Sequence, residues 1–281
     1  MIRRSYACLE CGVPGSKQVQ QTHFRKAGRG PPLVVLHPSP MSSAFMEPLI
    51  GLLQDRVTVT APDTPGYGMS DPLPDEPQSL EPYVHWLASF LKSQNLGSAG
   101  IYGSATGAQI AVQFSRRYPE MSDYVILDNA VHFTEEERQD ILAKYFPDMT
   151  PQADGRHLST AWEMSSGLFK QFPWYDQREE SRVSDAEPPL ALVHSTALAY
   201  LNAGVDYSRA YRAAFLNEDA RNIQQITRPT RVIRWAGSIL KRYADRLDEF
   251  EWLDHIRMVP CAASPEARFA AIRQAVAELA G

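Results

Sequence analysis

Hydrophobic positions along this chain form compact apolar runs that alternate with helical repeats. Residues 33–36 (LVVL) and 57–61 (VTVTA) are short runs of β-branched residues and leucine, each followed by a turn-forming stretch. Runs of this kind predict strands that are buried on both faces. Between them, apolar residues recur at helical spacing over residues 45–53, after serines that could cap a helix.

The same alternation continues along the chain. Two short strands at residues 4–10 and 20–26, joined by a turn around Pro14 and Gly15, are expected at the beginning. Further strands are expected at residues 97–103, 123–127, 230–237 and 256–261, and further helices at residues 79–91, 108–118, 243–252 and 265–279. Strands and helices in this order predict an α/β fold with a mostly parallel, doubly wound sheet.

The strand rhythm stops in the middle of the chain. Residues 134–226 are mostly helical in pattern and are interrupted by several prolines. A structureless loop of this length would be unusual, so a helical insertion that forms a lid is expected. We therefore predict a core domain built from residues 1–133 and 227–281, and a helical cap built from residues 134–226.

Composition and charge narrow the functional classes. The chain is 44% hydrophobic and has a net charge of −5 without a basic stretch, which argues against nucleic-acid binding or a membrane surface. The chain has no run of about 18 apolar residues that would predict a membrane span, and its first residues lack the apolar run of a secretory signal. The odd cysteine count fits a reducing cytoplasm. Cys8 and Cys11 have C-x-x-C spacing, but no second pair completes a zinc site.

Three motifs in the expected order resemble those of the α/β-hydrolase superfamily. LHPSP at residues 36–40 is similar to the family's His-Gly loop, and APDTPGYGMSD at residues 61–71 is similar to its D-x-x-G-x-G-x-S segment. IYGSATGA at residues 101–108 is similar to the nucleophile elbow. The resemblance covers roughly residues 4–280 and implies the family's sheet with a cap insertion.

The elbow motif has the family's glycines but lacks its nucleophile. In such a turn a strand leads at once into a helix, so the residues two before and two after the tip must be small, as Gly103 and Gly107 are. The tip itself is Ala105, whose methyl group cannot attack a substrate. The resemblance implies an oxyanion hole made by the backbone N–H groups of Ser39 and Thr106, because Pro38 has none to donate.

The other two members of the usual triad are also missing. Leu240 stands where the resemblance places the acid, and no histidine follows the strand at residues 256–261, where it places the base. The candidate acid–base groups that remain are Asp128 at the end of one strand, His37 in the oxyanion loop and His132 beside the insertion.

Aromatic residues of the insertion predict the nature of the ligand. Ser104 beside the turn and the aromatic residues of the insertion are expected to line the pocket; the candidates are Ser104, Trp162, Phe172, Trp174 and Tyr175. Aromatic walls with few charges indicate a small, largely apolar or aromatic ligand.

Three hypotheses for the function follow. The first is an enzyme with a non-standard site that acts on a small carbonyl compound as a lyase, cyclase, decarboxylase or C–C bond-cleaving enzyme. The second is a conventional acyl or ester hydrolase inactivated by substitution at residue 105, and the third is a catalytically dead ligand-binding protein. The sequence has no dinucleotide fingerprint, phosphate loop or metal-ligand cluster, so no cofactor or metal is expected. The expected partner is a small molecule, in a cytoplasmic protein that is compatible with a homodimer.

Overall fold

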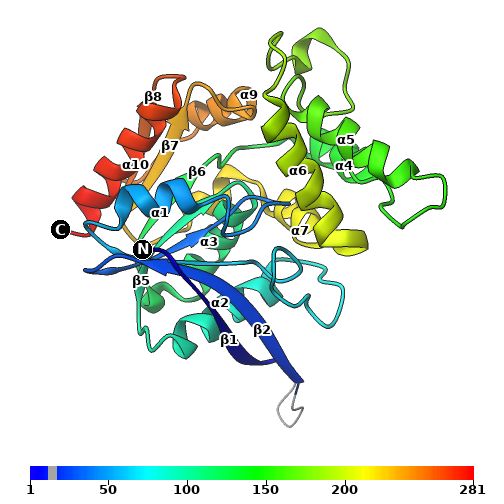
Figure 1. Ribbon diagram of the computed structural model, residues 1–281. Helices are drawn as coiled ribbons and strands as arrows, with labels where there is room; N and C mark the ends of the chain where they lie inside the picture. Colours follow the sequence, from blue (N-terminus) through cyan, green and yellow to red (C-terminus); the bar gives the residue numbers. More distant parts are fainter. Residues whose placement is uncertain (12–17) are drawn as a thin grey trace.

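The computed structural model describes residues 1–11 and 18–281 and shows an eight-stranded sheet flanked by helices (Figure 1). The predicted turn at Pro14 and Gly15 lies outside the described residues. Along the sheet the strands are ordered β1-β2-β4-β3-β5-β6-β7-β8. Their bounds are β1 Arg3–Cys11, β2 Gln18–Ala27, β3 Pro32–Leu36, β4 Thr58–Pro62, β5 Ala99–Ser104, β6 Ser122–Asp128, β7 Thr230–Trp235 and β8 Ile256–Cys261.

The sheet is antiparallel only at its beginning. β1 pairs with β2 and β2 pairs with β4 in antiparallel fashion, while the strands from β4 to β8 pair in parallel. The predicted fold class, a mostly parallel doubly wound sheet, is confirmed. The helices are α1 Glu47–Leu53, α2 Glu81–Ser93, α3 Thr106–Arg117, α4 Glu135–Lys144, α5 Arg156–Leu168, α6 Leu190–Ala203, α7 Arg209–Asn217, α8 Ala220–Gln224, α9 Lys241–Asp245 and α10 Pro265–Leu279, with short 3-10 turns η1 Pro119–Met121, η2 Glu179–Ser181, η3 Gly204–Asp206 and η4 Arg246–Glu249.

Both faces of the sheet are buried because successive side chains of a strand point to opposite sides. In β3, Val34 and Leu36 join the apolar cluster that contains residues of α2 and α3. Leu33 and Val35 join a second cluster that contains residues of α1 and α10. This double burial explains why the central strands are solid apolar runs in the sequence.

Residues 134–226 form helices α4 to α8 between β6 and β7, and we call this segment the helical insertion. In Figure 1 it stands beside the sheet, on the side away from α10. Aromatic contacts join it to the core: Phe133, which follows β6, lies 5.6 Å from the ring of Phe215 in α7 and 4.6 Å from the ring of Tyr243 in α9.

One element differs from its prediction. Instead of a helix over residues 243–252, the chain forms α9, the 3-10 turn η4 and then extended backbone at Phe250. The indole of Trp252 donates to the Leu247 carbonyl, so the polypeptide folds back on the turn instead of continuing a helix. Among the described residues, the longest apolar stretch within any helix is too short to cross a membrane.

Candidate active site

The turn from β5 into α3 is sharply strained at Ala105. Ala105 has φ 48° and ψ −113°, a combination that residues with a side chain rarely adopt. A Cβ at Gly103 would lie 2.1 Å from the Gly107 carbonyl oxygen, and one at Gly107 would lie 2.4 Å from that of Leu36. The two glycines therefore allow strand, turn and helix to approach, as the sequence predicts.

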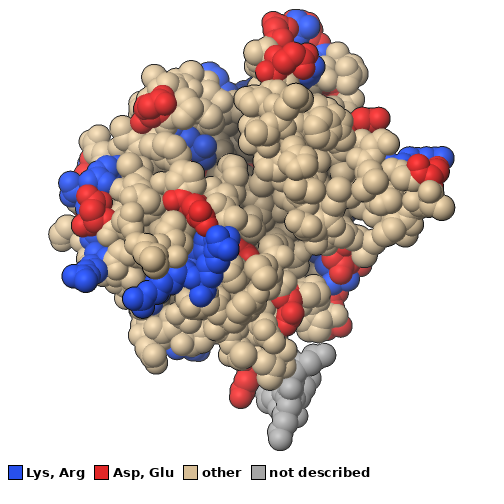
Figure 2. Space-filling model, viewed as in Figure 1, with Lys and Arg blue, Asp and Glu red and all other residues tan. Residues whose placement is uncertain are grey.

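A cavity of about 350 Å³ lies above this turn, enclosed by the core on one side and the helical insertion on the other. Figure 2 shows the molecule hollowed between α9 and α6, with basic side-chain atoms at the rim. The walls are mostly apolar and aromatic, and residues from both parts contribute; they include Phe45, Ala105, Phe133, Leu168, Phe172, Tyr211, Phe215 and Trp235.

Two of the five residues predicted to bind the ligand line this cavity, namely Ser104 and Phe172. The other three lie elsewhere because their side chains have other neighbours. Trp162 is on the exposed side of α5, and the indole of Trp174 donates to the Tyr145 carbonyl. The hydroxyl of Tyr175 donates to Asp140.

Ser39 and Thr106, the residues predicted to polarise a carbonyl, both line the cavity beside Ala105. Thr106 is the first residue of α3, so its backbone N–H has no partner within the helix. The positive end of the helix dipole points to the same place. An oxygen that gains negative charge in the cavity would therefore meet a favourable field at this turn.

Asp128 is fully buried at the end of β6 and does not line the cavity. Its Oδ2 accepts the Tyr102 hydroxyl at 2.6 Å and the Arg268 Nε at 2.9 Å, and lies 2.7 Å from Arg268 Nη2. The next residue, Asn129, has φ 57° and does line the cavity. Its Oδ1 accepts the hydroxyl of Ser238 at 2.7 Å, so the cavity has an amide where the sequence predicts a carboxylate.

His37 lies behind the cavity wall, and both of its ring nitrogens are engaged. Nδ1 lies 3.0 Å from the Pro38 carbonyl oxygen, and Nε2 accepts the backbone N–H of Thr64 at 2.9 Å. Burial lowers the pKa of this imidazole, which favours the neutral form. Its predicted acid–base role stays a prediction, and this placement points instead to a structural role.

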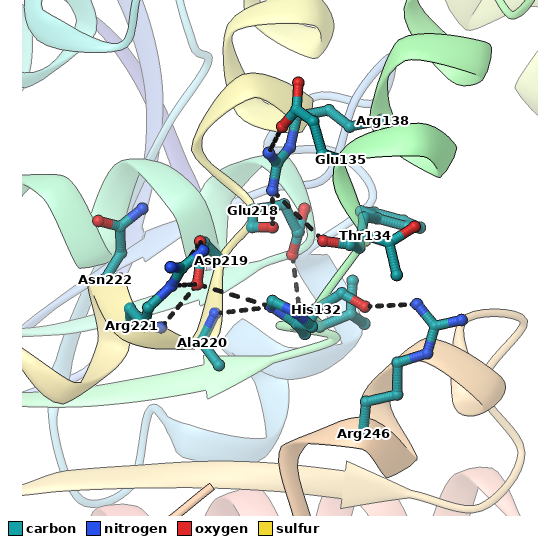
Figure 3. A network of polar contacts seen from close by, with 12 residues as sticks. His132, Thr134, Glu135, Arg138, Glu218, Asp219, Ala220, Arg221, Asn222 and Arg246 are labelled. Atoms are coloured by element: carbon teal, nitrogen blue, oxygen red, sulfur yellow. Dashed lines mark hydrogen bonds and ion pairs between the residues drawn. The ribbon is translucent and has the colours of Figure 1, made fainter. Parts of the chain in front are cut away.

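His132 also lies outside the cavity, in the polar network drawn in Figure 3. Its Nδ1 accepts the backbone N–H of Ala220 at 3.3 Å and lies 3.6 Å from Asp219. Desolvation lowers the pKa of this histidine, and the carboxylate of Asp219 opposes the shift. Its catalytic role likewise stays a prediction, and among the described lining residues there is no histidine at all.

Glu218 lines the cavity and was missed by the sequence analysis. It follows α7 and is 4% exposed, with its Oε1 accepting Gln109 Nε2 at 2.7 Å and the Val131 N–H at 3.1 Å. Burial raises the pKa of this carboxyl to about 8, so it is protonated at neutral pH. Figure 3 shows Glu218 between His132 and Arg138, whose Nη2 donates to the Glu218 carbonyl.

Arg268 is the second group that the sequence analysis did not identify. It belongs to the first turns of α10, and its guanidinium reaches the cavity beside Trp235, with its central carbon 4.8 Å from the centre of the indole ring. Neither Glu218 nor Arg268 belongs to a recognisable sequence motif. Each is held at the cavity by a hydrogen bond to a residue more than a hundred positions away. The described residues hold no group of three potential metal ligands.

Comparisons with known proteins agree with this architecture. A family model described as alpha/beta hydrolase fold matches residues 31–238. The 2-(acetamidomethylene)succinate hydrolase of Mesorhizobium japonicum is 30% identical over 120 residues, which is 43% of this chain and 43% of that protein. An uncharacterised protein of Mycobacterium tuberculosis is 31% identical over 123 residues, 42% of this chain and 36% of its own length. The matched regions thus span less than half of these curated relatives.

Among solved structures, a thermophilic esterase from Thermogutta terrifontis superimposes with a TM-score of 0.72 at 16% identity. That match covers 99% of this chain and 100% of the esterase. At such low identity the superposition supports the fold alone. Together with the family model, which covers more than half of the sequence, it leads to one conclusion: the chain belongs to the α/β-hydrolase fold family.

Proposed function

We propose that this protein is an enzyme that performs acid–base chemistry on a small, largely apolar or aromatic carbonyl compound, without a covalent acyl-enzyme. The reaction class is that of a lyase, decarboxylase, cyclase or C–C bond-cleaving enzyme. Glu218 transfers the proton, and the backbone N–H groups of Ser39 and Thr106 form the oxyanion hole.

The observation that carries this proposal is the placement of Glu218, whose buried side chain lies on the cavity wall. Both hydrogen bonds that its side chain accepts go to Oε1, so the proton of the neutral acid resides on Oε2. No described residue forms a hydrogen bond with Oε2. A carboxylic acid held in this way on the wall of an apolar cavity is arranged to donate a proton to a ligand.

The proposed chemistry uses first the backbone N–H groups of Ser39 and Thr106 and then the carboxyl of Glu218. The substrate carbonyl oxygen binds at the N–H groups of Ser39 and Thr106, which stabilise the enolate formed when a bond at the neighbouring carbon breaks. Glu218 then protonates that carbon and becomes a carboxylate, and a proton from water restores the acid. The proton lost by Glu218 is the proton gained by the product, so the cycle balances.

Acyl transfer at residue 105 is less well supported by the same geometry. A serine nucleophile needs an adjacent base that accepts its proton, and the described lining residues include no histidine. The relatives that are hydrolases therefore support the α/β-hydrolase fold of this chain. The side chains of its cavity favour acid–base chemistry over acyl transfer.

Proton exchange into simple ketones tests the proposal without knowledge of the natural substrate. In deuterated water, the ionised fraction of Glu218 can remove an α-hydrogen of phenylacetone or benzoylacetone and return a deuteron to the same carbon, so we expect the protein to accelerate this exchange, measured by proton NMR. The Glu218→Gln variant should lose about 100-fold or more of this acceleration, within the range usual for general acid–base catalysis. Glutamine preserves the shape and the neutral charge, so the fold should be kept.

The matched control is Glu136→Gln, which makes the same chemical change at an exposed position of α4 and should exchange like the wild type. Exchange in the Glu218→Gln variant at the wild-type rate would contradict the role of Glu218. Ligand binding without any accelerated exchange would favour a ligand-binding protein instead.

The pH dependence gives a second test of the same residue. Only the protonated form of Glu218 can donate, and the pKa of this group is about 8. We therefore expect protonation of the product carbon to be constant below neutral pH and to fall tenfold per pH unit above about pH 8. Exchange of α-hydrogens, which starts with the ionised form, should instead rise up to about pH 8. A protonation step that rises through this range would contradict donation by the neutral acid.

A further inference from the structure

The charged groups around the cavity are few. Among the described lining residues, only Glu218 and Arg268 have a carboxyl, guanidinium, amine or imidazole side chain, and the phenol of Tyr211 has a raised pKa and stays neutral. Because Glu218 is a neutral acid at neutral pH, Arg268 provides the one full charge that faces the ligand. Burying a cation beside apolar walls costs free energy unless other groups contact it. The contacts of Arg268 therefore show which of its N–H groups are left for a ligand.

Part of the Arg268 guanidinium is occupied by Asp128. Nε and Nη2 form the side edge of the fork, and both face Asp128 Oδ2, at 2.9 Å and 2.7 Å. The aromatic ring of Trp235 covers one face of the same group. These contacts fix the orientation of the side chain, since an arginine fork held by a carboxylate and an aromatic ring has little rotational freedom left.

The end edge of the fork, formed by Nη1 and the second N–H of Nη2, is not used by Asp128. The side chain of Arg268 keeps 18% of its surface exposed, whereas that of Asp128 keeps none. Because Arg268 lines the cavity and its printed contacts with Asp128 use Nε and Nη2, the end edge of the fork is left for a ligand. Two parallel N–H groups match the two oxygens of a carboxylate.

We propose that the end edge of Arg268 binds a carboxylate of the ligand, so that the cavity selects small aromatic or apolar carboxylates. The inference deepens the proposed function and rests on it for the use of this cavity as the substrate site. The carbonyl then lies toward Ser39 and Thr106, the apolar body contacts the aromatic walls, and the carboxylate is held at α10.

A pair of probes with the same shape tests the proposal in the wild-type protein. We expect 3-phenylpropanoate to bind at least about tenfold more tightly than 3-phenylpropanamide near neutral pH, measured by isothermal titration calorimetry. Equal affinities, or no binding of the carboxylate at millimolar concentration, would overturn the proposal.

Variants then assign the preference to Arg268. Replacement of Arg268 alone leaves Asp128 buried without its cation and endangers the fold, so the double variant Arg268→Gln with Asp128→Asn is used. It should bind the two probes equally. The matched control is Arg273→Gln on the same helix, where Arg273 pairs with Asp55 away from the cavity and the preference should persist.

The test of the carboxylate site can fail or succeed independently of the test of the acid–base role of Glu218. The Glu218→Gln variant should keep the preference for 3-phenylpropanoate while it loses proton exchange. In the unsubstituted protein, a preference for 3-phenylpropanoate without catalysed exchange would overturn the acid–base role and leave the carboxylate site standing. A preserved preference in the double variant would overturn the role of Arg268.

Discussion

Ala105 adopts a backbone conformation that costs on the order of 1–3 kcal/mol and needs support from its surroundings. That support is visible: its N–H donates to the Asp128 carbonyl of the neighbouring strand, and the flanking glycines admit the close approach of strand and helix. The conformation follows from the scaffold, and it therefore persists with a methyl group at the tip. Chemistry at the site depends on which side chains surround the turn.

Introducing a hydroxyl at residue 105 tests whether the backbone of the turn is enough for hydrolysis or whether the surrounding side chains decide it. We expect the Ala105→Ser variant to fold and to remain inactive toward p-nitrophenyl acetate and butyrate, because none of the described residues that line the cavity is a histidine able to accept the serine proton. Release of p-nitrophenolate is the measurement, and the unsubstituted protein is the control. A burst of one equivalent followed by turnover would instead identify a conventional hydrolase that had lost only its nucleophile.

At the scale of elements, the sequence predicts most strands well because the central sheet is buried on both faces. Each such strand is a continuous apolar run, as at residues 33–36. It can be recognised from its own residues, without knowledge of the strands that it pairs with. The cavity is harder to predict, because α7 and α10 bring Glu218 and Arg268 to it through contacts that are distant in sequence. Aromatic residues of the insertion show the same limit: Phe172 faces the cavity, whereas the nearby Trp174 packs against α4.

The contact between α3 and β3 can be tested through a single glycine. A Cβ at Gly107 would meet the backbone oxygen of Leu36, which cannot move without shifting the sheet. We expect Gly107→Ala to lower the free energy of unfolding by about 1–3 kcal/mol, as overpacking usually does. Urea denaturation followed by circular dichroism measures the change.

Gly51 provides the matched control for this substitution. It lies in α1 with open space around its Cα, so Gly51→Ala should raise the free energy of unfolding by about 0.5–1 kcal/mol through helix propensity. If both alanines proved stabilising, the close approach of α3 to the end of β3 would not be a constraint on this fold.

At the scale of the whole molecule, the junction between core and insertion places an acid where it resists ionisation. Glu218 follows α7 of the insertion, yet its side chain bonds to Gln109 of α3 and to the backbone after β6. Ionisation would therefore put a buried charge between the two parts that Arg138 and the two hydrogen bonds offset only in part. The free energy of unfolding should therefore depend on the ionisation of Glu218, because unfolding exposes its carboxyl to water.

The sign of the effect follows from the two pKa values of Glu218. Between its usual value of 4.5 and the folded value of about 8, the folded chain holds a proton that the unfolded chain has lost. Raising the pH through this window therefore destabilises the folded state, by at most about 1.4 kcal/mol per pH unit for one group. Above about pH 8 both states are ionised and the contribution of Glu218 no longer changes.

Comparison with the Glu218→Gln variant isolates this contribution, since the other titrating groups are common to both proteins. We expect the free energy of unfolding of the wild type, relative to the variant, to fall steadily between about pH 5 and about pH 8 in urea titrations. The Glu136→Gln variant should track the wild type at every pH, because its carboxyl is exposed in both states. A difference between wild type and the Glu218→Gln variant that stays constant with pH would mean that Glu218 ionises in the folded protein as it does in water, and the proton donor proposed for the cavity would be lost with it.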